Sequence, residues 1–177
     1  GSNLSGKIAA TAPTGVYTIT FNGKNDEGFA DKSKGLATFT ITVSGIPVWE
    51  GKNPGDQTIK PGSPFTAVDM ATYFTNPTGS GDLTFKTDDA KSISVQLGTG
   101  TAHPLNGSNL FDAGKGITLS GTSLSGTIPA NATPGVYTIR FAGANTVGTA
   151  GDQAIFKVTV TGVPVWDHKA PSDQKLQ

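Results

Sequence analysis

Two stretches towards the end of the chain, residues 136–141 and 154–160, alternate between apolar and polar side chains. An alternation with a period of two is the pattern of a β-strand that buries one face. The loop between the two stretches contains glycine and asparagine, which favours an antiparallel pair. The positions expected to face the core are Tyr137, Ile139, Phe141, Ala154, Phe156, Val158 and Val160.

Shorter apolar runs, separated by turn residues, predict further strands. These are expected at residues 64–69, 83–87, 92–97, 117–119 and 123–128. Residues 98–116 are predicted to form a long loop, residues 68–74 are compatible with one helical turn, and no amphipathic helix is expected. About seven short strands at this spacing are typical of an all-β, immunoglobulin-like antiparallel β-sandwich.

The chain also repeats itself. The segment Gly-Val-Tyr-Thr-Ile occurs at residues 15–19 and again at 135–139, an offset of 120 residues. Beyond a loop that is shorter in the second copy, the offset becomes 117, and Gly-Ile-Pro-Val-Trp at 45–49 matches Gly-Val-Pro-Val-Trp at 162–166. A unit of this length exceeds the roughly 20–50 residues of a solenoid repeat and is close to an immunoglobulin-like domain of about 100 residues.

The repeat predicts three parts. Residues 1–46 are expected to be the C-terminal part of one repeat, residues 47–162 a complete repeat, and residues 163–177 the N-terminal segment of the next. Linkers are expected at 44–53 and at 161–170. The inter-repeat junction residues are then Pro47, Trp49, Pro164 and Trp166. Proline restricts a linker, and each tryptophan is expected to cap the core of the following domain or to pack between domains.

Composition narrows the range of functions. Charged residues make up 15% of the chain, with 13 basic and 13 acidic side chains, so a basic stripe for nucleic acid is not expected. No apolar run approaches the roughly 20 residues of a membrane helix, which argues against membrane insertion. The absence of cysteine fits a bacterial extracellular protein better than a disulfide-rich secreted domain. The Gly-Ser pair at residues 1–2 is interpreted as a cloning remnant.

Catalytic chemistry is not expected. The two histidines, His103 and His168, lie in unlike parts of the repeat, and the adjacent acids Asp88 and Asp89 would point to opposite faces of a strand. No phosphate-binding loop follows the glycines at 98–100. Two binding functions stay open: a carbohydrate- or protein-binding module, for which the loop aromatic Phe111 is the candidate, and an accessory domain of a secreted enzyme.

A series of short motifs along residues 47–161 resembles a known family. The motifs are Asp56-Gln57, Tyr73-Phe74, Gly81-Asp82-Leu83-Thr84-Phe85, Leu124-Ser125-Gly126-Thr127 and Gly135-Val136-Tyr137-Thr138-Ile139. They resemble the dystroglycan-type, cadherin-like domain that occurs in tandem in giant bacterial surface adhesins of the RTX class. The resemblance implies a structural spacer repeat, located extracellularly on a bacterial cell surface, that projects ligand-binding regions and has neighbouring repeats as its partners.

Structural calcium is an open alternative that the same resemblance raises. The family often has an acidic Asp-Pro-Asp-Gly-Asp loop, whereas residues 76–82 here read Asn-Pro-Thr-Gly-Ser-Gly-Asp and keep only the last acid. Calcium prefers several carboxylate and carbonyl oxygens. The candidate calcium ligands are Glu50, Asp56, Asp82, Asp167 and Asp173.

Residues 1–46 would expose an apolar face if they carry only the last strands of a sandwich. Two completions are open. In the first, residues 163–177 of another copy add a strand in a head-to-tail exchange; in the second, the first segment packs against the complete domain.

Overall fold

The computed structural model describes residues 4–9, 11–30, 36–111 and 116–162, and these residues form a mostly-β protein with several antiparallel sheets. The strands are β1 (Gly15–Phe21), β2 (Lys24–Asn25), β3 (Gly28–Phe29), β4 (Ala37–Val43), β5 (Val48–Trp49), β6 (Gln57–Ile59), β7 (Pro64–Asp69), β8 (Phe74–Thr75), β9 (Ile93–Leu97), β10 (His103–Pro104), β11 (Ile117–Ser120), β12 (Ser123–Thr127), β13 (Gly135–Phe141) and β14 (Ala154–Val160). Helical structure in this part of the chain is limited to two 3-10 turns, η2 (Met70–Tyr73) and η3 (Leu105–Gly107). Neither is long and apolar enough to cross a membrane.

The largest sheet has five strands in the order β10-β9-β13-β14-β6. The predicted antiparallel pair is confirmed: β13 and β14 align Tyr137 with Val158 and Ile139 with Phe156. All seven positions expected to face the core are at most 2% exposed, so the alternation predicted the buried face correctly. The short strand β6 adds to the free edge of β14 in parallel.

A second sheet has three antiparallel strands in the order β11-β12-β7, with a bulge in β12 between Leu124 and Gly126. Side chains of the two sheets meet in one core. The rings of Phe65 on β7 and Phe156 on β14 have centroids 6.2 Å apart, and Phe141 makes an edge contact with Phe156 at 6.3 Å. The predicted strands 64–69 and 92–97, and the pair from 117 to 128, are confirmed to within one residue at each end.

The predicted strand at 83–87 is wrong. Only Thr84 makes a β-bridge there, with Ala144, and Phe85 turns into the core with 6% exposure. The predicted long loop from 98 contains β10 and η3, and it is anchored because Leu105 and Leu110 are fully buried. The single helical turn expected near residues 68–74 is present as η2, capped by the carboxylate of Asp69.

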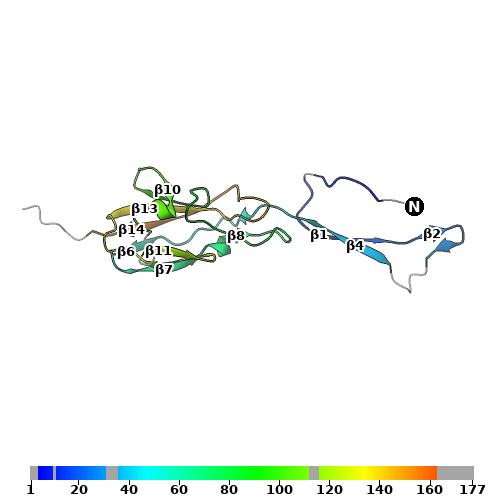
Figure 1. Ribbon diagram of the computed structural model, residues 1–177, viewed down its shortest axis with the longest axis horizontal. Helices are drawn as coiled ribbons and strands as arrows, with labels where there is room; N and C mark the ends of the chain where they lie inside the picture. Colours follow the sequence, from blue (N-terminus) through cyan, green and yellow to red (C-terminus); the bar gives the residue numbers. More distant parts are fainter. Residues whose placement is uncertain (1–3, 10, 31–35, 112–115, 163–177) are drawn as a thin grey trace, which may run out of the picture.

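Strands β1 and β4 form a separate two-stranded sheet that extends away from one end of the 47–162 unit (Figure 1). Their register places Tyr17 opposite Ile41 and Ile19 opposite Phe39, as β13 and β14 place the equivalent residues. Here, however, Tyr17, Phe21 and Phe39 are exposed to solvent, Phe21 by 54%, and Ile19 and Ile41 are only partly buried. The 47–162 unit therefore leaves the apolar face of β1 and β4 uncovered.

One side-chain hydrogen bond is the same in both copies of the repeat. The hydroxyl of Tyr17 donates to the carbonyl oxygen of Pro13 at 2.8 Å, and that of Tyr137 donates to the carbonyl oxygen of Thr133 at 2.8 Å. Each bond spans four residues and fixes the turn before the strand. The two segments 120 residues apart thus have the same local structure as well as the same sequence.

Candidate functional site at the inter-repeat junction

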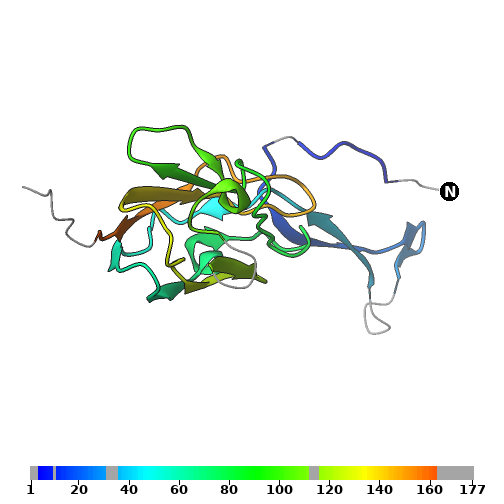
Figure 2. The same ribbon diagram turned by 60° about the vertical axis from the view of Figure 1, so that its left-hand side comes forward.

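The linker between β4 and β5 passes between two loops of the 47–162 unit. One loop is residues 76–82, which follow β8, and the other is residues 143–149, which connect β13 to β14. The linker lies where the β1–β4 pair meets the unit (Figure 1), and the turned view shows the same arrangement (Figure 2). The sequence placed its junction residues at this point of the chain.

Gly45 is held on both sides of its backbone. Its N–H donates to the hydroxyl oxygen of Ser80 at 2.9 Å, and its carbonyl oxygen accepts from the side-chain amide of Asn145 at 2.8 Å. Ser80 is fully buried. A linker residue whose donor and acceptor are both satisfied by one neighbouring unit cannot rotate without losing both bonds.

The side chain of Asn145 is itself fixed at both ends. Its oxygen accepts from the backbone N–H of Val147 at 2.9 Å and of Gly148 at 3.1 Å, which is a local asparagine turn. Its amide nitrogen donates to the side-chain oxygen of Asn76 at 2.9 Å in addition to Gly45. These partners leave one orientation for the amide, with the NH₂ group facing the linker.

The two loops are also tied to each other. The carbonyl oxygen of Ser80 accepts from the backbone N–H of Thr146 at 3.1 Å and from its hydroxyl at 2.7 Å. Asn76 closes its own loop by donating to the carbonyl oxygen of Gly81 at 2.8 Å. The linker therefore sits between two loops that hold a fixed separation.

Close packing accompanies the hydrogen bonds. Gly79 has a φ of +75°, and a Cβ at this residue would collide with Cγ2 of Thr42 on β4. A Cβ on Gly148 would lie 3.0 Å from Cγ2 of Ile46. Glycine is needed at position 79 for two reasons, the left-handed backbone and the approach of β4.

Pro47 and Trp49 lie on the side of the linker that belongs to the 47–162 unit. Pro47 is buried, and Trp49 is aligned with Phe74 in the β5–β8 pair and packs against the core. The indole N–H of Trp49 donates to the carbonyl oxygen of Lys52 at 2.8 Å. The two equivalent residues predicted at the second junction, Pro164 and Trp166, lie outside the described residues.

The calcium candidates that the structure describes are not gathered into one group of three or more carboxylates. Glu50 accepts a hydrogen bond from the hydroxyl of Thr75, and Asp56 accepts from the backbone N–H of Lys157 at 2.7 Å. Across residues 4–9, 11–30, 36–111 and 116–162, no three His, Cys, Asp or Glu side chains are grouped to hold a metal ion. Asp82 is thus not part of such a group, and Asp167 and Asp173 lie outside the described residues.

The other residues considered in the sequence as candidates for binding or catalysis make packing, turn or strand contacts. Phe111 is half buried and packs against the core, so only part of its ring is open to a ligand. Asp89 accepts from the backbone N–H of Lys91 at 2.9 Å and shapes a turn. His103, on the edge strand β10, is aligned with Val95 of β9. His168 lies outside the described residues.

One titratable group in the unit has a shifted pKa. Burial raises the pKa of the Tyr137 hydroxyl above its usual value. The same hydroxyl donates to the carbonyl oxygen of Thr133 and holds the turn there; this hydrogen bond lowers the pKa, and the effect of burial is larger.

The sequence did not single out Asn76, Ser80 or Asn145 as junction residues. Neutral polar residues in loops carry little sequence signal, and residues 76–82 differ from an acidic calcium loop in the carboxylates that they lack. One signal was present: Asn145 matches Asn25 at the repeat offset of 120. Comparison with protein-family models and with curated proteins finds no match to this chain.

Proposed function

We propose that this chain is a stretch of immunoglobulin-like spacer repeats, joined end to end by junctions that hydrogen bonds hold in place, from a long bacterial surface adhesin. The observation that carries the proposal is the double hydrogen bond on Gly45, to Ser80 and from Asn145. A protein that bridges distance needs linkers that keep their direction, and this contact fixes one. Neighbouring repeats of the same chain are then the partners.

The immunoglobulin-like assignment is supported by strand order. The orders β11-β12-β7 and β9-β13-β14 match the strand orders of the two sheets in that fold. Buried side chains of both sheets belong to one core. The hydrogen bond from Tyr137 to Thr133 has the geometry of the tyrosine corner, in which a tyrosine near the start of a strand bonds to the backbone a few residues upstream. Tyr17 repeats this feature in the first copy.

The end-to-end arrangement is supported by where the chain enters and leaves the unit. The linker lies at one end of the 47–162 unit and the end of β14 lies at the other (Figure 1). Successive units joined in this way extend along one direction. The location on a bacterial cell surface and the adhesin as parent protein rest on the family resemblance and on a cysteine-free composition.

Small-angle scattering tests the proposal on a length series. Copies of residues 1–120 are placed before the intact chain, so that each addition inserts one whole repeat. The maximum dimension is expected to grow by a constant step per repeat, both with calcium and with a chelator. Growth that levels off, as for freely jointed linkers whose span follows the square root of their number, would contradict a fixed junction.

A further inference from the structure

The loop between β1 and β4 contains a second copy of the hairpin that holds the linker. Residues 23–30 read Gly-Lys-Asn-Asp-Glu-Gly-Phe-Ala, and residues 143–150 read Gly-Ala-Asn-Thr-Val-Gly-Thr-Ala. Four positions are identical between the two hairpins. The shared residues are Gly23, Asn25, Gly28 and Ala30, which match Gly143, Asn145, Gly148 and Ala150.

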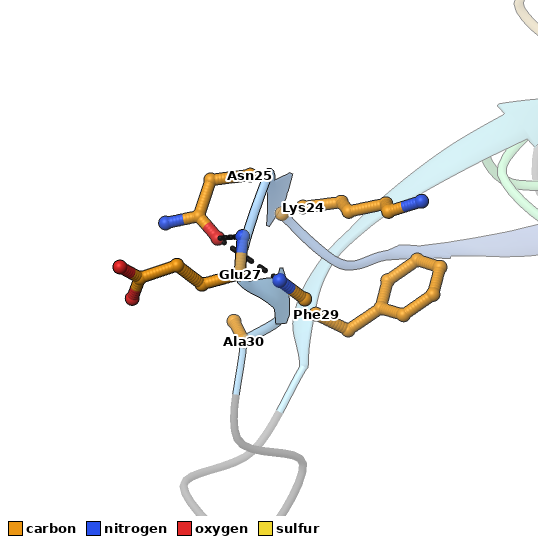
Figure 3. A pocket seen from close by; sticks show the side chains of 7 residues that line it. Lys24, Asn25, Glu27, Phe29 and Ala30 are labelled. Carbon is orange, nitrogen blue, oxygen red and sulfur yellow. Dashed lines mark hydrogen bonds between the residues drawn. The ribbon is translucent and has the colours of Figure 1, made fainter.

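The two hairpins also have the same internal bonds. The side-chain oxygen of Asn25 accepts from the backbone N–H of Glu27 at 3.0 Å and of Gly28 at 3.1 Å, as Asn145 does in its own turn. The backbone bond from Ala30 to Gly23 is 2.8 Å long, as is the equivalent bond in the second hairpin. The asparagine oxygen is therefore fixed, and the NH₂ group is left to face outwards (Figure 3).

Two of the four identical positions are those that contact the linker. In the second hairpin, Asn145 bonds to Gly45, and Gly148 gives room to Ile46. Both of these positions are unchanged in the first hairpin. The positions that differ, at residues 24, 26, 27 and 29, correspond to residues 144, 146, 147 and 149, for which no hydrogen bond to the linker is found in the described residues.

We propose that the hairpin at residues 23–30 is a second linker-binding site, and that its ligand is the end of another repeat with the sequence Gly-Ile-Pro or Gly-Val-Pro. Asn25 donates its side-chain amide to the glycine carbonyl oxygen, and the apolar residue that follows packs over Gly28. The inference rests on the proposed function, because it supplies the same junction one repeat earlier.

The surroundings of the hairpin suit this ligand. An open hollow of about 530 Å³ lies against residues 23–30, and Phe29 beside it is 70% exposed. The ammonium group of Lys24 lies 5.4 Å from the centre of the Phe29 ring, on the side of the hairpin away from the Asn25 amide (Figure 3). Among the described residues the Asn25 amide donates to no acceptor, whereas its equivalent donates to two.

The contact between loops is not repeated in the same form. Thr146, which donates to the carbonyl oxygen of Ser80, is replaced by Asp26, which has no hydroxyl to donate. The conserved part of the site is thus the part that holds the linker, and the loop-to-loop tie is specific to the second junction.

The test uses a tandem protein in which residues 1–120 precede the intact chain. Because residues 1–3 of the second copy align with residues 121–123, residues 47–120 of the first copy and 1–46 of the second make one complete repeat. The linker glycine of the first copy, Gly45, then meets Asn25 of the second copy. Hydrogen exchange of the two Gly45 amides, followed by NMR, reports each junction separately.

Asn25→Asp in the second copy keeps the oxygen that accepts the two turn bonds and removes the NH₂ donor. The exchange of the first-copy Gly45 amide is expected to rise by about two- to tenfold, the effect of one lost hydrogen bond, while the second-copy Gly45 amide stays unchanged. The same substitution in the first copy, where no repeat precedes it, serves as the control and should change neither amide. Combining Asn25→Asp with Glu27→Gln keeps the net charge constant and should give the same rise.

Two results overturn the inference in different ways. If the shared repeat folds and Asn25→Asp leaves the first-copy Gly45 amide unchanged, while Asn145→Asp accelerates the second-copy amide, the site at Asn25 is excluded and the spacer function stands. If the shared repeat does not fold, so that Tyr17 of the second copy stays exposed, the equivalence of the repeats fails and the proposed function fails with it.

Discussion

Phe39 and Phe156 stand at the same position of the repeat, yet Phe39 is 39% exposed and Phe156 is 1% exposed. Their strand partners are also equivalent, Ile19 for the first and Ile139 for the second. The difference comes from the second sheet, which covers β13 and β14, whereas within the described part of the chain no sheet covers β1 and β4. The β1–β4 pair thus has the apolar face of a core strand pair without a second sheet packed on it.

Truncation of these two residues is expected to have unequal effects. Phe156→Ala removes a ring from a filled core and should lower the free energy of unfolding by about 3–5 kcal/mol. Phe39→Ala removes a ring that is already partly in water and should cost a small fraction of that. Urea unfolding followed by circular dichroism measures both, and equal losses would show that β1 and β4 are covered in solution, by another copy or by another part of the chain.

Loss of the tyrosine hydroxyl should likewise depend on the copy. Tyr137→Phe removes the buried bond to Thr133 and is expected to destabilise the 47–162 unit by about 0.5–1.5 kcal/mol, the net value of one hydrogen bond. Tyr17→Phe removes the same bond at an exposed site and should leave the unfolding midpoint of the unit unchanged. A lower midpoint in Tyr17→Phe would mean that the two parts unfold together.

Alkaline pH should weaken the unit through Tyr137. Burial raises the pKa of its hydroxyl above the value of about 10 in an unfolded chain. The folded state then holds the phenol proton more tightly, so the stabilisation is complete below that pH and is lost as pH rises through the raised pKa. Urea midpoints measured from about pH 9 to pH 11 should fall more steeply for the native chain than for Tyr137→Phe; parallel curves would contradict the assignment.

The hydroxyl of Ser80 should control the linker. Ser80→Ala fits the same buried space but leaves the Gly45 N–H without its acceptor. The exchange rate of the Gly45 amide is expected to rise by about two- to tenfold, with little change in the core amides of β13. Ser108→Ala removes a hydroxyl that bonds within its own loop and serves as a control, since it should not affect Gly45.

Gly79 tests the close approach of β4. Gly79→Ala adds a left-handed alanine, which costs about 1–2 kcal/mol, and a collision with Thr42. Gly62→Ala is the matched control, because Gly62 has a φ of +78° and open space around it. Gly79→Ala should therefore lower the thermal midpoint more than Gly62→Ala does. Adding Thr42→Ser, which removes Cγ2, should abolish this extra loss. Identical losses in the two glycine variants would argue against the contact.

The sequence predicted the long strands well because their periodicity reports directly on burial. The bounds of β7 and β14 agree with the predicted ranges, and the inner face of β13 was identified residue by residue. Short strands left no such pattern. The three residues of β6 and the two of β10 pair because tertiary contacts hold them at a sheet edge, and two or three residues cannot show a period.

The failure at residues 83–87 has a similar cause. The alternation of Leu83, Thr84 and Phe85 resembles a strand, but only Thr84 finds a backbone partner. Leu83 and Phe85 instead pack into the core beside Phe74. Local pattern shows that these side chains are buried, and it does not show which strand edge is available to the backbone.

The candidate site was less accessible to sequence reasoning than the fold. Its position followed from the repeat boundary, but its chemistry depends on Ser80 and Asn145, which lie 65 residues apart and meet only in the folded unit. The junction proline and tryptophan could be predicted because they lie in a repeated motif, and tryptophan occurs only twice in the chain. The residues that hold the linker are common types whose role is set by geometry.

The parallel pairing of β6 with β14 sets how the unit responds to a pulling force. Along the chain, β6 is the first and β14 the last strand of the five-stranded sheet. The backbone N–H of Thr161 extends their ladder with a 3.0 Å bond to the carbonyl oxygen of Ile59. When opposite ends of the chain are drawn apart, parallel terminal strands slide along each other and their hydrogen bonds are loaded together in shear. A unit built in this way resists tension with the whole ladder and does not open bond by bond.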